Sequence, residues 1–103
     1  MIQFGSLDYA ELRFQQMRAT VEIRDKQWID VELHLELEEG MALPDDFTEL
    51  TALIFCTYAG EIAQIVPQDE GRDCEYQFTA DEKEQLIHYY EQNVKPKLLS
   101  MVS

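Results

Sequence analysis

The sequence holds few cysteines, glycines and prolines, and each shortage narrows the class of protein. Two cysteines, Cys56 and Cys74, are too few for the disulfide framework of a small secreted domain. The four glycines and three prolines stand singly, so they indicate turns between elements and give no linker, repeat or domain boundary. Met1 to Gly5 shows no basic segment leading into an apolar run. We therefore expect no signal peptide and a cytoplasmic protein with reduced thiols.

Positive charge and long apolar runs are also scarce. No stretch approaches the roughly 18 uninterrupted apolar residues of a membrane-spanning helix. Lysine and arginine number 8 against 21 acidic residues, which gives a formal net charge of −13. Because binding to nucleic acids and to anionic membranes relies on Lys and Arg, we expect neither direct nucleic-acid binding nor membrane association. A protein partner with a basic surface is favoured instead, with fast and salt-sensitive association.

The motifs of common enzymes are missing as well. The sequence has no Gly-x-Ser-x-Gly, no phosphate-binding glycine-rich loop and no His-Glu-x-x-His. Cys56 and Cys74 are too far apart for Cys-x-x-Cys chemistry, and we expect Cys56 to be buried as a small apolar residue. We therefore predict a non-enzymatic protein with no catalytic residue and no cofactor.

The two histidines have carboxylate neighbours, but their spacing suits a metal ion poorly. His34 lies between Glu32 and Glu36 on an expected strand, where side chains about 6–7 Å apart rarely converge on one ion. His88 follows Glu84 at a spacing of four, whereas Glu-x-x-His metal sites use a spacing of three. We expect both histidines to be exposed polar residues and predict no metal site.

The sequence does contain enough apolar material for one folded domain. Hydrophobic residues make up 46% of the chain, with one Trp, five Tyr and five Phe. A disordered acidic chain would lack these residues, because it could not bury enough apolar surface to offset chain entropy. A chain of 103 residues can form one core without disulfides or a metal. We expect a single domain over 1–103.

The clearest secondary-structure pattern lies between Ala19 and Glu38. Val21 and Ile23 alternate with polar residues, and a longer alternation begins at Trp28. Its apolar set is Ile29, Val31, Leu33, Leu35 and Leu37, and its other set is Trp28, Asp30, Glu32, His34, Glu36 and Glu38. Because strand side chains alternate between two faces, the pattern predicts an antiparallel hairpin with one face on the core and one in water.

The C-terminal region predicts a helix. Thr79 to Glu82 is typical of a capping box, in which the Thr79 hydroxyl accepts from the N–H of Glu82 and the Glu82 carboxylate accepts from the N–H of Thr79. Apolar residues then follow at spacings of four: Leu86, Tyr90 and Val94. Pro96 disfavours helical geometry at the residue before it, so we expect a helix over about 80–94 that ends or kinks there.

The middle of the chain is compatible with two structures. Asp46 to Glu49 is a second capping-box pattern, and Gly60 suits the position after a helix end, which predicts a helix over 47–59. The β-branched and aromatic residues of the same stretch favour instead a strand over 51–58, a turn at Ala59-Gly60 and a partner strand over 61–66.

The N-terminal region leaves a similar choice. A capping-box pattern at Asp8 to Glu11 predicts a short helix over 9–17, while Leu12 and Phe14 are equally compatible with the beginning of a strand. Later in the chain, Pro67 is expected to end the strand over 61–66. A polar loop then covers 68–73 and a short strand 74–78.

Together these elements predict an α+β fold. We expect a two-layer domain with a mostly antiparallel sheet of about four strands and two or three helices packed on one face.

The candidate functional feature is an acidic row along the expected strand. Between Gln27 and Gly71 the sequence contains no Lys or Arg. The residues that we predict to bind a basic protein are Trp28, Asp30, Glu32, Glu36 and Glu38. Neighbouring acids would lie about 6.6 Å apart, whereas duplex DNA carries about one charge per 1.7 Å, so one row falls well short of a nucleic-acid mimic. The plain alternatives are a solvated sheet face for the acids and packing under a loop for Trp28.

Three functions stay open at this point. The first is an acidic interaction module that docks onto a basic surface. Small acidic proteins without motifs are common among accessory proteins of mobile elements and phage inhibitors, so inhibition of a nucleic-acid-binding enzyme is one form of it. The second is a homo-oligomeric structural or assembly protein that associates through a sheet edge or a helix face. The third is a small enzyme or ligand-binding domain with an unrecognised carboxylate site. Composition alone establishes none of them.

Overall fold

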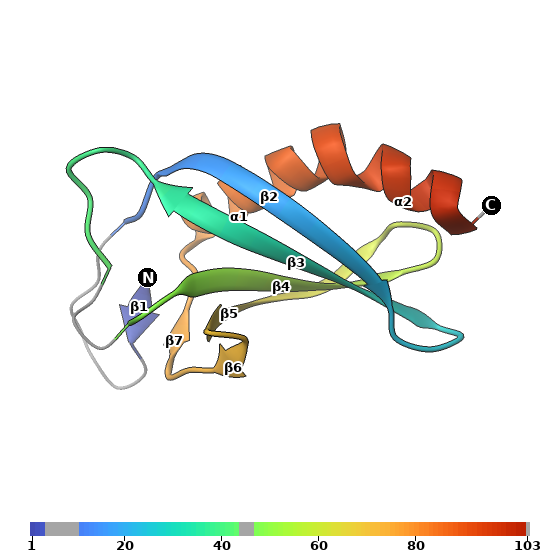
Figure 1. The fold of residues 1–103 in the computed structure, drawn as a ribbon, viewed down its shortest axis with the longest axis horizontal. Coiled ribbons are helices and arrows are strands. Elements are labelled where there is room, and N and C mark those ends of the chain that lie inside the picture. Colours follow the sequence, from blue (N-terminus) through green and yellow to red (C-terminus); the bar gives the residue numbers. More distant parts are fainter. Residues whose placement is uncertain (4–10, 44–46, 103) are drawn as a thin grey trace.

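The computed structural model describes residues 1–3, 11–43 and 47–102, and Figure 1 shows its arrangement. The elements are β1 (Ile2–Gln3), β2 (Phe14–Ile23), β3 (Trp28–Leu37), β4 (Leu50–Thr57), β5 (Ile62–Asp69), β6 (Arg72–Asp73), β7 (Tyr76–Gln77), α1 (Ala80–Tyr89), the π-helical turn η1 (Tyr90–Val94) and α2 (Lys95–Val102). Five strands pair antiparallel in the order β2-β3-β4-β5-β6, and β1 pairs with β7. The expected α+β class is confirmed. The sheet is larger than expected, and the described residues form one continuous helix instead of two or three.

The alternation of β3 gives the sheet two different faces. Ile29, Val31 and Leu33 are fully buried. The register places them beside Cys56, Ile54 and Ala52 of β4, which are also fully buried. The side of the sheet that carries these residues is the inner face, and the opposite side is the outer face. The predicted hairpin is confirmed, with a second strand over Trp28–Leu37 and a first strand that begins earlier than expected, at Phe14.

The longer first strand makes the helix expected over 9–17 wrong from Phe14 onward. Phe14–Ile23 pairs with β3 along nearly its whole length, so the alternative of a strand beginning near Phe14 is correct. Residues 9 and 10 and the capping residue Asp8 lie outside the described part of the chain. The carboxylate of Glu11 accepts from the Thr79 hydroxyl at 2.9 Å, and so contacts a helix distant in sequence. A short helix is marginal by itself, whereas pairing with β3 satisfies the backbone along ten residues.

The helix expected over 47–59 is also wrong, and the alternative is confirmed. Residues 50–57 form strand β4, a turn follows at Tyr58-Ala59, and β5 returns beside β4. β4 is the central strand, so both of its edges are paired. This pairing, together with the strand preference of residues such as Ile54 and Phe55, outweighs the two capping signals. Gly60 has φ +83° in the loop between the strands instead of capping a helix.

β5 continues through Pro67 to Asp69 and does not end at the proline as expected. The C=O of Pro67 accepts from the thiol of Cys74 beyond the sheet edge. The backbone N and C=O of a strand residue point to the same side. The nitrogen of Pro67 therefore faces that edge, and its lack of an N–H removes no hydrogen bond to β4. The strand expected over 74–78 is shorter, since only Tyr76–Gln77 is a strand (β7), and the expected loop over 68–73 contains the end of β5 and the short strand β6.

The helix begins as predicted and ends later. Both bonds of the Thr79–Glu82 capping box are present. Pro96 does not stop the helix, because the turn before it is widened to π-helical form: the N–H of Lys95 bonds to the C=O of Tyr90, five residues back. The buried side chains are spaced by four: Leu86, Tyr90, Val94 and Leu98. In an α-helix, residues four apart differ by about 40° around the helix axis, so three such steps would rotate the buried face by about 120°. The one extra residue of the π turn offsets about 100° of this rotation.

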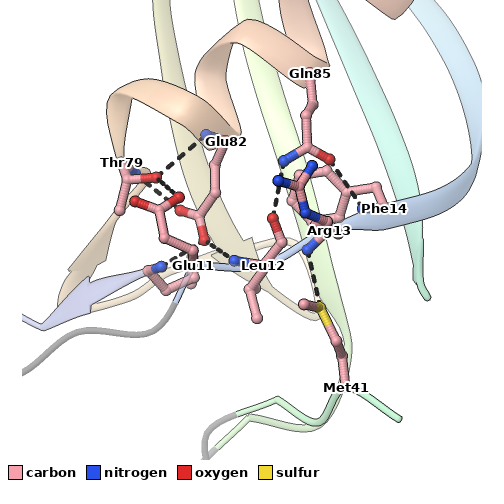
Figure 2. A network of polar contacts seen from close by, with 9 residues as sticks. Glu11, Leu12, Arg13, Phe14, Met41, Thr79, Glu82 and Gln85 are labelled. Carbon is pink, nitrogen blue, oxygen red and sulfur yellow. Dashed lines mark hydrogen bonds and ion pairs between the residues drawn. The ribbon is translucent and has the colours of Figure 1, made fainter. Parts of the chain in front are cut away.

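A fully buried carboxylate fixes the start of this helix to the start of β2. The Glu82 side chain accepts from the N–H of Leu12 at 2.7 Å and from the N–H of Thr79 at 2.8 Å. It also pairs with the α-ammonium group of Met1 at 2.5 Å. Figure 2 shows how Glu82 lies between the helix start and the chain before β2. Three separate segments of the chain therefore meet at one charge.

Replacing this carboxylate with an amide should destabilise the fold strongly. Glu82→Gln keeps the shape but leaves the buried ammonium without a counter-charge, so we expect the free energy of unfolding to fall by about 2–4 kcal/mol. Glu84→Gln, an exposed position on the same helix, is the matched control and should change it by less than about 0.5 kcal/mol. Urea denaturation measures both. Equal effects would show that Glu82 does not tie these segments together.

The loop at Gly60 should tolerate alanine less well than another loop with the same backbone conformation. Gly60 and Gly40 both have positive φ, so alanine costs about 1–2 kcal/mol at either position. A Cβ at Gly60 would also lie 3.1 Å from Cγ and Cε of Lys95, whereas one at Gly40 meets nothing within 4 Å. Gly60→Ala should therefore cost roughly 1 kcal/mol more than Gly40→Ala in the same urea experiment. A smaller loss for Gly60→Ala would contradict the close approach of this loop to the helix.

Candidate functional site

The C-terminal helix packs on the inner face of the sheet and leaves the outer face without a helical layer (Figure 1). Register and alternation bring together on the outer face Gln16, Arg18, Thr20 and Glu22 from β2; Trp28, Asp30, Glu32, His34 and Glu36 from β3; Thr51, Leu53, Phe55 and Thr57 from β4; and Gln64, Val66 and Gln68 from β5. The candidate site is this face, because it carries the acidic row predicted from the sequence.

The five predicted residues differ in their surroundings. Trp28 is half-buried at the start of β3. The carboxylate of Asp30 is 23% exposed and forms an ion pair with Arg24 at 3.0 Å. Glu32 is 37% exposed and its Oε1 lies 2.8 Å from Nε2 of His34. Glu36 and Glu38 are exposed, and the described residues offer neither of them an ion-pair partner. The negative charge of the row is therefore compensated near Trp28 and uncompensated at the other end.

At the Trp28 end, an arginine organises an aromatic cluster. The guanidinium of Arg24 lies 4.5 Å from the centre of the Phe55 ring while it holds Asp30. Trp28 and Phe55 line a shallow hollow of about 270 Å³ together with Arg24, Ala63 and Gln64. Leu53 and Val66, a directly opposed and half-buried pair, continue the apolar surface along the outer face. This end offers flat apolar contact area with one fixed positive charge.

The other end of the outer face brings together acids of β3 and Glu49, the residue before β4. His34 is half-buried and lies between Glu32 and Glu49, with its Nδ1 3.5 Å from the Glu49 carboxylate. The carboxylate of Asp69 accepts from the N–H groups of Thr48 and Glu49 at 3.0 and 2.8 Å. The N–H of Glu70 donates to the C=O of Glu49 at 2.9 Å. These backbone contacts hold the ends of β4 and β5 together, and Glu49, which lies beside His34, extends the acidic end beyond β3.

Glu49, Asp69 and Glu70 were not among the predicted residues. They lie at the ends of β4 and β5, whose register the sequence left open, so no local pattern places Glu49 beside His34. The long stretch without Lys or Arg was the available signal, because it covers β3, β4 and β5 entirely. His34 was expected to be plainly exposed and instead is held between two carboxylates.

The two cysteines are placed differently from each other. Cys56 is fully buried, as expected, and its thiol donates to the C=O of Ile29 at 3.5 Å. Burial raises the pKa of the Cys56 thiol, and the nearby Asp30 raises it further, against the opposing effect of a hydrogen bond with Tyr90. Burial also raises the pKa of Tyr90, whose hydroxyl donates to the C=O of Gly60 at 2.7 Å. A buried thiol kept protonated in this way is a packing group and a poor nucleophile.

Within 1–3, 11–43 and 47–102, no group of three or more His, Cys, Asp or Glu side chains is placed to hold a metal ion. His88 is exposed on α1. None of the described helices is long and apolar enough to cross a membrane.

Thiol labelling should distinguish the two cysteines. In native protein the half-exposed Cys74 should react readily with a thiol-specific disulfide reagent, whereas Cys56 should react only after opening of the fold. In a Cys74→Ser variant we expect labelling at pH 8 to be at least about 100-fold slower in buffer than in denaturing urea. Fast native labelling of that variant would contradict the burial and the raised pKa of Cys56.

No protein-family model matches the chain, and comparisons with curated proteins and with solved structures find no significant match. A proposal of function therefore rests on the geometry of the chain itself.

Proposed function

We propose that this protein is a cytoplasmic, non-enzymatic interaction module whose outer sheet face docks onto a basic surface of another protein. The observation that carries the proposal is the composition of that face. It combines a half-buried apolar centre with an acidic end, and three of its four strands, β3, β4 and β5, contain no Lys or Arg.

Charge supports a basic partner. The chain has a formal net charge of −13, and the carboxylates at the end of β3, β4 and β5 have few compensating groups. Clusters of one sign attract oppositely charged partners over a distance and speed their association. Glu36 and Glu38 are the members of the predicted set best placed for this role, because both are exposed.

The apolar centre supports docking of a protein surface. Interfaces bury aromatic and aliphatic anchors in the middle and keep charges at the rim, and Trp28, Leu53, Phe55 and Val66 form such a centre. A stable interface needs about 800 Å² from each partner. The molecule measures 42 Å by 26 Å along its two longer axes, so one sheet face is large enough.

Uniform mimicry of a nucleic acid is a weaker proposal than docking. Arg24 compensates Asp30, so the row is not uniformly charged, and Glu32 is held close to His34. A basic, nucleic-acid-binding protein remains the class of partner whose surface matches the acidic end. Occupation of that surface by this chain would inhibit such a partner.

Charge reversal at the acidic end should weaken the complex, and reversal elsewhere should not. Proteins captured from a lysate by the immobilised chain are first identified and purified. Their affinity is then measured by calorimetry at about 50 mM and about 300 mM NaCl. We expect Glu36→Lys/Glu38→Lys to weaken binding at least about tenfold at low salt, with a smaller loss at high salt.

The matched control is Glu84→Lys/Glu91→Lys, which makes the same change in net charge on the exposed surface of the helix region. It should alter binding much less. A partner that binds both double variants equally, or whose binding ignores salt, would contradict docking through the outer face.

A further inference from the structure

β2 is an edge strand of the sheet, and side chains of α1 form hydrogen bonds with the backbone at its beginning. The Gln85 amide accepts from the N–H of Phe14 at 3.0 Å and donates to the C=O of Leu12 at 2.8 Å (Figure 2). The Tyr89 hydroxyl donates to the C=O of Met17 at 3.0 Å. These side chains occupy the place of a neighbouring strand and form hydrogen bonds with the outward-facing backbone groups of this part of the edge.

The second part of the same edge is open. The C=O of Met17 points away from β3, and alternate residues of a strand direct their backbone groups the same way. Ala19, Val21 and Ile23 therefore also direct N–H and C=O groups outward. Within the described ranges, no hydrogen bond reaches these groups. The side chain of Ile23 is 49% exposed, which adds a large apolar group to this edge.

The scarce positive charge of the chain gathers around this edge. Arg13, Arg18, Arg24 and Lys26 lie in or beside β2. Lys97 of α2 lines a groove of about 290 Å³ together with Ala19 and Val21. β3, β4 and β5 contain no Lys or Arg. Two copies of this acidic chain would therefore repel each other least if they met at β2.

The outer-face side chains of β2 are complementary to themselves in one register. Arg18 and Glu22 are both exposed, and neither has an ion-pair partner among the residues that the structure describes. Within the sheet, Glu22 lies opposite Asp30, a pairing of like charges. Antiparallel pairing of two β2 edges about a twofold axis at Thr20 sets Arg18 of each copy opposite Glu22 of the other. Shifting the two strands past each other by two residues, in one direction or the other, sets Arg18 opposite Arg24 or Thr20 instead.

We propose that two copies of this chain associate through the Ala19–Ile23 edge of β2, with the twofold axis at Thr20. The backbone of Ala19 in each copy then pairs with that of Val21 in the other, and the two five-stranded sheets become one continuous sheet. Ile23 of each copy lies opposite Met17 of the other, whose C=O stays bonded to the Tyr89 hydroxyl, so the new backbone pairing is confined to Ala19 and Val21. This inference does not rest on the docking proposal, because it concerns the edge of β2 and a second copy, whereas docking concerns the outer face and a basic protein.

The opposite edge of the sheet is less suited to a second copy. β5 is open only between a register shift near Ala63 and the proline at 67, which shortens the edge available for pairing. Its surroundings from Glu61 to Glu75 contain five acids (Glu61, Asp69, Glu70, Asp73, Glu75) and one arginine, Arg72. Pairing of two such edges would bring like charges together.

A charge swap tests the proposed register. Molar mass by light scattering during gel filtration, at about 100 µM protein and about 150 mM NaCl, should be twice the mass of the chain. Arg18→Glu should give a folded monomer, because it sets acids opposite acids in both pairs. The double change Arg18→Glu/Glu22→Arg should restore the dimer, because it exchanges the two partners of each pair.

Hydrogen exchange and a proline variant test the proposed dimer independently of the charge swap. The amides of Ala19 and Val21 should be protected in the wild type and exchange at least about tenfold faster in Arg18→Glu, with circular dichroism unchanged. Val21→Pro, which removes an outward N–H, should also be monomeric. A wild type that is monomeric under these conditions overturns the proposal. So does a dimer that survives Arg18→Glu, or a charge swap that fails to restore the dimer while remaining folded.

Discussion

The packing of Ile29, Val31 and Leu33 against the C-terminal helix is the constraint on which the other features of the fold depend. Strand side chains alternate strictly, so burying these three residues forces the even-numbered residues of β3 to the opposite side. Because directly opposed residues of paired strands lie on the same face, the pairing extends this division into inner and outer residues to β2, β4 and β5. With one helix available, one face of the sheet becomes core and the other keeps the acids.

The distribution of charge follows from this arrangement and separates two surfaces. The acidic end of the outer face is built from β3 and the start of β4, within a stretch that has no Lys or Arg. Six of the eight positive side chains lie in or beside β2 or in the second half of the helix: Arg13, Arg18, Arg24, Lys26, Lys95 and Lys97. One surface therefore suits a basic partner and the other a second copy.

The sequence was informative where a local signal had no competing signal in the same stretch. The alternation over 28–37 and the Thr79–Glu82 box each lie within one element, and both were predicted correctly. Residues 47–59 carry helix caps and strand formers at once, and pairing on both edges of β4 decides between them. The passage of the helix through Pro96 depends on Tyr90 and Leu98 both facing the sheet, which no local rule expresses. The acidic end depends on how β4 lies beside β3, so Glu49 was missed, although the stretch without Lys or Arg indicated its region.

The central claim is that the outer face, and not the helix side, is the surface that binds a basic partner. Methyl spectra of the labelled protein, recorded while an identified partner is added, test it most directly. The account predicts shifts for the methyl groups of Leu53 and Val66 on the outer face, with those of Leu99 and Met101 on the helix unchanged. Shifts confined to the helix methyl groups, with Leu53 and Val66 unmoved, would contradict it.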